Sequence, residues 1–146
     1  MTFSRSCEYA LQATLYLSIR HNAGVDTVSL QEIAESQKIP SHFLSKILQS
    51  LVRHGLLMST KGPRGGFRLI NRPEDIRLLD IVSMIDGLEM FDRCGIGLRA
   101  CSDDNPCPIH HEYKVIKSRI RQVLTTKSLA ELSRDVERGA AIIAIK

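Results

Sequence analysis

The alternation of apolar and polar residues predicts that the N-terminal half of the chain is mainly helical. Residues 3–21 lack Gly and Pro, and their mostly apolar side chains predict one long helix. A linker that contains glycine ends it. Ser29 and Glu32 then have the spacing of a capping box, in which the serine accepts a hydrogen bond from an unpaired backbone amide. This spacing predicts a short second helix that ends near Gln37.

The third predicted helix has one apolar face and one polar face. It follows the break at Ile39-Pro40 and runs to Gly55, a residue type suited to helix ends. One stripe at helical spacing consists of Phe43, Leu44, Ile47, Leu48 and Leu51. The opposite face carries His42, Ser45, Lys46, Gln49 and Arg53. A short helix, a tight turn and an amphipathic helix with a polar face are typical of a helix-turn-helix.

Two short segments after Gly55 predict a β-hairpin. Residues 56–60 and 68–70 flank the Gly/Pro-rich basic loop KGPRGGF. A hairpin directly after a recognition helix is a wing, although an ordinary surface hairpin would explain the loop if it stood alone. In a wing, Gly65 and Gly66 would let the backbone approach DNA, while cations for phosphates or a minor groove would come from Lys61, Arg64 and Arg68. We therefore expect a mainly α fold with a small β-hairpin wing, a winged helix-turn-helix over residues 1–87.

The C-terminal half is predicted to hold a long loop and a dimerisation helix. A short helix over 76–86 precedes a loop over 88–108. Apolar residues then recur at heptad spacing, at Ile109, Tyr113, Ile116, Ile120 and Val123. This stripe could pack on its own domain, but little of the chain is left to cover it, so we expect a homodimer formed by residues 109–146. A second capping box at Ser128 predicts a short last helix, which is followed by an apolar tail over 140–145.

The charge of the 146 residues is unevenly distributed. Residues 1–72 hold nine Lys/Arg and four Asp/Glu, a net charge of +5, whereas residues 73–146 have a net charge of −1. This basic excess fits a polyanionic partner, and a solvated surface would fit the charge alone equally well. No segment has the pattern of a signal peptide or a membrane span. We therefore expect a cytoplasmic protein with no membrane partner, whose thiols stay reduced.

Three of the four cysteines lie in the long loop. With the histidine that follows, Cys94, Cys101, Cys107 and His110 form the pattern C-x6-C-x5-C-x2-H. Thiolates and imidazole suit zinc, iron or an iron–sulfur cluster, and the gaps are wider than those of a zinc knuckle, which favours a cluster. An enzyme with a nucleophilic cysteine would not need three thiols together. We therefore expect neither an enzyme nor a small-molecule substrate.

The fourth ligand has two candidates. His110 is the nearer one. Glu8 is the only acidic residue among the first 25, and it lies on a mostly apolar helix where an unpaired carboxylate would be costly. An exposed or ion-paired Glu8 is the simpler interpretation. Cys7 lies on the same helix among apolar residues, and we expect it in the core.

The segments RSCEYALQA, KGPRGGFRL and LLDIV, taken with the cysteine loop, resemble the iron–sulfur winged-helix repressors of the IscR and NsrR type over nearly the whole chain. The resemblance implies a homodimeric regulator that binds a double-stranded DNA operator and carries a cluster on Cys94, Cys101 and Cys107. IscR-like members take a histidine three residues after the last cysteine as fourth ligand, which matches His110. NsrR-like members take an acidic residue from the first helix of the other subunit, which matches Glu8.

The same resemblance places the base-reading positions of the third helix at His42, Ser45 and Lys46. We further expect Arg5 and Tyr9 to anchor the first helix on the DNA backbone. A 2Fe-2S cluster is favoured and a 4Fe-4S cluster remains possible. The signal is then redox state, nitric oxide or iron supply. A zinc site and a metal-free switch driven by thiol oxidation stay open as alternatives.

Overall fold

The computed structural model describes residues 3–143, which form a mainly helical fold with one β-hairpin, as predicted. The helices are α1 (Arg5–Asn22), α2 (Leu30–Gln37), α3 (Ser41–Arg53), α4 (Leu78–Ile85), α5 (His110–Thr126) and α6 (Leu129–Glu137). The strands are β1 (Leu57–Thr60) and β2 (Gly66–Leu69), and short 3-10 turns occur at Pro73–Asp75 and Glu89–Phe91. Within residues 3–143, no helix is both long and apolar enough to cross a membrane.

Capping serines begin α2 and α6 at the predicted places. Ser29 and Ser128 each accept a hydrogen bond from the backbone amide three residues later, at 3.1 and 3.2 Å. In a complete capping box, the Glu32 carboxylate would also accept a hydrogen bond from the Ser29 backbone amide, and it does not do so here. Instead, the Glu32 carboxylate accepts a hydrogen bond from the Tyr16 hydroxyl at 2.7 Å and pairs with the Arg20 guanidinium at 3.1 Å. Glu32 thus ties α2 to α1, because both of its partners lie on α1.

The core forms around α1, which packs against α2, α3, α4 and α6. Fully buried side chains from several elements meet there, and they include Leu17, Ile33, Leu44, Leu48, Leu51, Leu57, Ile81 and Leu129. The predicted apolar stripe of α3 is buried except for Phe43, which is 51% exposed. Phe43 belongs to the predicted stripe but not to the buried core. This residue lies at the edge of the stripe, where no other element within residues 3–143 covers it.

The hairpin is held against the rest of the domain by a third extended segment. Strands β1 and β2 pair antiparallel, with Leu57 opposite Leu69. Val28, just before α2, exchanges two backbone hydrogen bonds with Phe67, at 2.9 and 2.8 Å. Gly66 has a φ of +154°, and a Cβ atom on it would lie 2.3 Å from the Val28 carbonyl oxygen. The fold itself therefore requires a glycine at this position, whether or not the wing contacts DNA.

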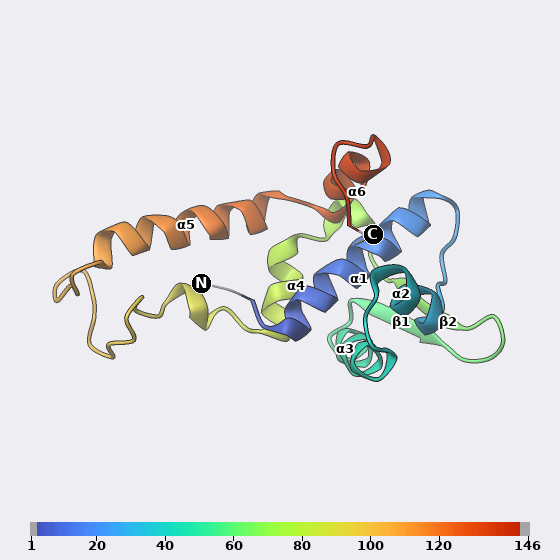
Figure 1. Cartoon of the computed structure of the whole chain (residues 1–146), viewed down its shortest axis with the longest axis horizontal. Coiled ribbons are helices and arrows are strands. Elements are labelled where there is room, and N and C mark those ends of the chain that lie inside the picture. The colour runs from blue at the N-terminus through green and yellow to red at the C-terminus, as the bar shows by residue number, and fades with distance from the viewer. Residues whose placement is uncertain (1–2, 144–146) are drawn as a thin grey trace.

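Helix α5 projects away from the body of the molecule, as Figure 1 shows. It contacts α4 and the 3-10 turn at Glu89–Phe91. The chain then returns to the body, where Arg77 and Ser128 form an isolated β-bridge and α6 packs on α1. The division into segments 1–87, 88–108 and 109–146 stays a prediction, but α6 contributes Leu129 to the main core. Residues 140–143 of the predicted tail have no regular secondary structure, and the rest of it lies outside the described residues.

Candidate metal centre and DNA-binding surface

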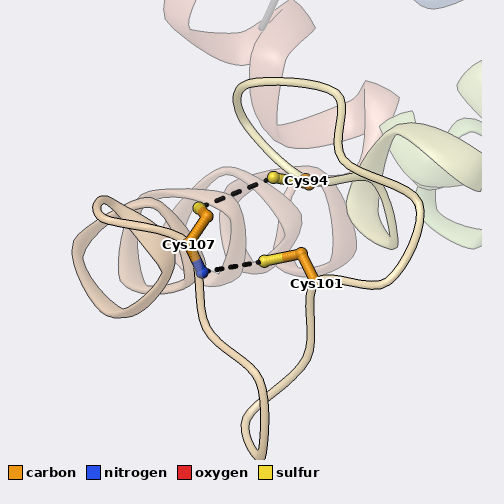
Figure 2. A group of neighbouring side chains, drawn as sticks. All are labelled: Cys94, Cys101 and Cys107. Atoms are coloured by element: carbon orange, nitrogen blue, oxygen red, sulfur yellow. Dashed lines mark hydrogen bonds between the residues drawn. The ribbon is translucent and has the colours of Figure 1, made fainter.

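The three loop cysteines converge at the outer end of α5. Figure 2 shows their side chains pointing toward one another, and their sulfur atoms all lie within 4.8 Å of each other. The Cys94 thiol donates to the Cys107 sulfur at 3.5 Å, and the Cys107 amide donates to the Cys101 sulfur at 3.4 Å. A turn closed by hydrogen bonds between the backbones of Ser102 and Asn105 lets the chain fold back between the second and third thiols. Three cysteines that are six or seven positions apart in the sequence thus bring their thiols together in space.

The cysteines differ in their acidity. The pKa of Cys94 is lowered to about 7, first by a hydrogen bond from the Ile96 backbone. The pKa of Cys7 is raised to about 12, first by burial and then by the Asp86 carboxylate. Cys7 is fully buried and belongs to the core, as predicted. Because the thiolate is the form that binds metals and reacts with oxidants, the loop and not Cys7 is suited to this chemistry.

His110 lies beside the thiols, whereas Glu8 does not. The Nδ1 atom of His110 is 3.2 Å from the Cys101 sulfur, and its Nε2 atom is 2.7 Å from Oδ1 of Asp103. Lys114 donates to both oxygens of Asp103, at 3.0 and 2.8 Å. Hydrogen bonds from Lys114 and then His110 lower the pKa of Asp103 to about 2. Glu8 is exposed on α1 and is not among the residues grouped around the sulfurs within residues 3–143.

The donor types fit zinc or an iron–sulfur cluster, while the sulfur spacing by itself suits a single ion. A tetrahedral ion with bonds of about 2.3 Å would set its sulfur ligands about 3.8 Å apart, which lies within the observed range. A cavity of about 580 Å³ also borders the sulfurs and is lined by residues that include Cys94, Leu98 and Cys101. This cavity offers room for an iron–sulfur core beside the thiols. The residues present therefore fit the implied cluster in their chemistry, and the thiols would move apart toward this cavity to hold it.

The polar face of α3 is available for contact. His42 and Lys46 are exposed, and Ser45 is half-buried between them. The exposed Phe43 ring packs on the His42 ring with centroids 4.2 Å apart, an arrangement that the sequence did not indicate. Helix α3 contains no acidic residue. Its outer face can therefore approach a phosphate backbone without charge repulsion.

The remaining predicted DNA contacts lie on the wing and on α1. Lys61 and Arg64 are exposed at the hairpin tip, and Gly65 lies between them and β2. The Arg5 guanidinium lies 6.0 Å from the centre of the Tyr9 ring at the start of α1. Contact of these residues with DNA stays a prediction.

Comparison with known proteins identifies the group to which this chain is related. The model of the Rrf2 family, described as an iron-dependent transcriptional regulator, matches residues 3–135. The chain belongs to the Rrf2 family. An HTH-type transcriptional regulator of Aquifex aeolicus is 35% identical over 134 residues, covering 90% of this chain and 91% of the relative. The HTH-type transcriptional regulator IscR of Aliivibrio salmonicida is 31% identical over 137 residues, covering 94% and 80%.

Solved structures confirm the winged-helix fold of this Rrf2 member. CymR, the global cysteine regulator of B. subtilis, superposes with a TM-score of 0.75 at 23% identity, over 92% of this chain and 97% of that one. The relatives are transcription regulators and not enzymes, in agreement with the absence of catalytic activity expected from the sequence.

Sequence reasoning missed Asp103 and Lys114. One signal was present, because His110 and Lys114 are four residues apart and therefore lie on the same helix face. The position of Asp103 depends on the turn between Ser102 and Asn105, which was not predicted.

Proposed function

We propose that this Rrf2-family chain is a homodimeric DNA-binding regulator whose operator affinity depends on an iron–sulfur cluster held by Cys94, Cys101, Cys107 and His110. The observation that carries the proposal is the convergence of three thiols within 4.8 Å of one another, with an imidazole nitrogen 3.2 Å from one of them. Support for an iron-containing group also comes from the description of the family as iron-dependent. When bound, a cluster supplies a redox-sensitive group that can be oxidised, lost or nitrosylated.

The choice of His110 over Glu8 as fourth ligand rests on contact within one chain. His110 touches Cys101 and is only 15% exposed in its side chain, whereas Glu8 is exposed on a different helix. A ligand from the other subunit would have to reach the thiols from outside. His110 is also the first residue of α5. A change in how His110 binds the metal would therefore change the orientation of this helix.

A second copy of the chain would cover the apolar stripe of α5. Ile109, Ile116 and Val123 of this stripe are 38%, 51% and 53% exposed, which is unusual for large apolar side chains that recur at heptad spacing. A homodimer would bury them and present two copies of α3 to two operator half-sites. A change at His110 would then alter the spacing of these helices. A tenfold change in affinity requires only ~1.4 kcal/mol, so a small rearrangement is sufficient.

Anaerobic purification tests the cluster directly. The protein should show visible absorbance and equal amounts of iron and acid-labile sulfide, with about two irons per chain for a 2Fe-2S cluster. Cys101→Ala should abolish the absorbance, while Cys7→Ala, which removes a thiol outside the loop, should retain it. Colourless protein with stoichiometric zinc would contradict the cluster and support a zinc site instead.

A metal-free thiol switch is the second candidate, because the sulfur atoms of Cys94 and Cys107 are only 3.5 Å apart. Reaction with hydrogen peroxide would join them: the two thiols lose two protons and two electrons, and the peroxide is reduced to two molecules of water. This function predicts colourless protein that loses DNA affinity on peroxide treatment and regains it with a dithiol. Normal binding after complete oxidation of both cysteines would exclude it.

A further inference from the structure

His110 is held from two sides, by the thiols on one side and by an acid on the other. Its Nδ1 atom is 3.2 Å from the Cys101 sulfur, and its Nε2 atom is 2.7 Å from Asp103. The imidazole side chain is 15% exposed, so the protein and not solvent sets its surroundings. The orientation of the ring is therefore determined by these two contacts.

Asp103 is itself fixed in position. It lies in the turn in which the backbones of Ser102 and Asn105 exchange hydrogen bonds of 3.1 and 3.2 Å, and the Asn105 side chain ties this turn to the Ala100 carbonyl at 3.1 Å. Lys114 then binds both carboxylate oxygens from one helical turn beyond His110. The carboxylate is thus clamped between two residues on the same face of α5.

An ionised carboxylate can only accept hydrogen bonds, so a neutral imidazole that contacts Asp103 through Nε2 must carry its proton on that atom. Its other nitrogen, Nδ1, then has an exposed lone pair, and this is the atom that lies next to the thiols. A metal-binding nitrogen needs such a lone pair. A carboxylate that accepts a hydrogen bond from the other ring nitrogen makes the imidazole a stronger electron-pair donor to a metal.

We propose that Asp103, held by Lys114, is a positioning residue that keeps the proton of His110 on Nε2 and presents Nδ1 as the ligand atom. The choice of tautomer follows from contacts within the chain. The role of Nδ1 as a ligand rests on the proposed metal centre. Asp104, the adjacent acid, is exposed and takes no part.

The tautomer can be measured by nitrogen-15 NMR of histidine-labelled, reduced and metal-free protein, above about pH 8 where histidine is ordinarily neutral. We expect the Nε2-protonated form in the unmodified chain and in the control Asp104→Asn. Asp103→Asn should give a mixture of tautomers, because an amide can donate to or accept from the ring with equal ease. An Nδ1-protonated His110 in the unmodified chain, or an unchanged tautomer in Asp103→Asn, would overturn the proposal.

Metal loading provides a second measurement. Asp103→Asn should weaken binding of the cluster, or of zinc, roughly 10- to 100-fold, and should raise the midpoint potential of a bound cluster, with Asp104→Asn unchanged. Circular dichroism confirms that each variant remains folded. If Asp103→Asn leaves the metal affinity and the midpoint potential unchanged, Nδ1 of His110 is not a ligand that Asp103 orients. If the unmodified chain binds neither cluster nor zinc, the proposed function fails, while the tautomer measurement still decides the role of Asp103.

Discussion

Replacement of Gly66 by alanine separates two roles that a wing glycine can have. In the sequence, Gly66 suggests a close approach of the wing backbone to DNA. In the structure, its Cα faces the backbone of Val28, and an added Cβ would lie 2.3 Å from the carbonyl oxygen and 2.5 Å from the carbonyl carbon. These are backbone atoms that cannot rotate away. We therefore expect Gly66→Ala to push the hairpin off the segment before α2.

The cost can be worked from the hydrogen bonds that this displacement breaks. Val28 and Phe67 exchange two backbone bonds of 2.9 and 2.8 Å. Each contributes about 0.5–1.5 kcal/mol net, so their joint loss lowers the free energy of unfolding by about 1–3 kcal/mol. For a domain of this length the corresponding fall in Tm is roughly 3–10 °C.

Thermal unfolding followed by circular dichroism measures this effect. Lys61→Ala is the matched control, because Lys61 is exposed in the same hairpin and its removal should leave Tm unchanged. Gly66→Ala with the Tm of the unmodified chain and only a weaker affinity for DNA would refute the packing argument. It would show that this glycine serves the DNA contact alone.

Three further predictions concern α3, α5 and the thiols. Lys46→Ala should weaken operator binding by about 1–3 kcal/mol in fluorescence anisotropy without lowering Tm, and unchanged affinity would remove this face of α3 from DNA recognition. Ile116→Glu should give folded monomers in sedimentation velocity, because this side chain is 51% exposed in the single chain; a persistent dimer would place the interface elsewhere. In metal-free protein, alkylation of Cys94 should accelerate as the pH rises through its pKa of about 7 and then level off, while Cys7, with a pKa of about 12, stays unmodified until the chain unfolds. Peptide mapping by mass spectrometry distinguishes the two thiols, and equal rates would contradict the difference in pKa.

The local elements were predictable because their signals are local. A serine followed three residues later by a glutamate marked the starts of α2 and α6, and the structure has a serine cap at both. The exposure of Phe43 was not predictable, since burial at the edge of an apolar stripe depends on which neighbour reaches it. The predicted helix over 76–86 begins only at Leu78, because Ile76 bonds instead to Leu129, far away in the sequence.

The ligand residues of the candidate metal site were predictable from the sequence. The hydrogen bond from His110 to Asp103, which orients one of them, was not. Cysteine and histidine are recognisable by residue type, so the spacing of Cys94, Cys101, Cys107 and His110 was sufficient to select them. Asp103 is an ordinary acid in a polar loop until the turn brings it to His110. Aspartates are common in loops, so only the three-dimensional arrangement distinguishes Asp103 from Asp104.

The β-bridge between Arg77 and Ser128 has a consequence for how the protein can be modified. The bridge pairs the residue before α4 with the residue before α6, so the excursion between them starts and ends at one place. Its first element, α4, packs on α1 and α3 and belongs to the body, and the cysteine loop and α5 follow it. Insertions with close ends tolerate changes in length and content without disturbing the host domain. The gaps between the cysteines can therefore vary while the body remains unchanged. The body, with α4 retained, is then a scaffold on which a different sensing segment could replace the cysteine loop.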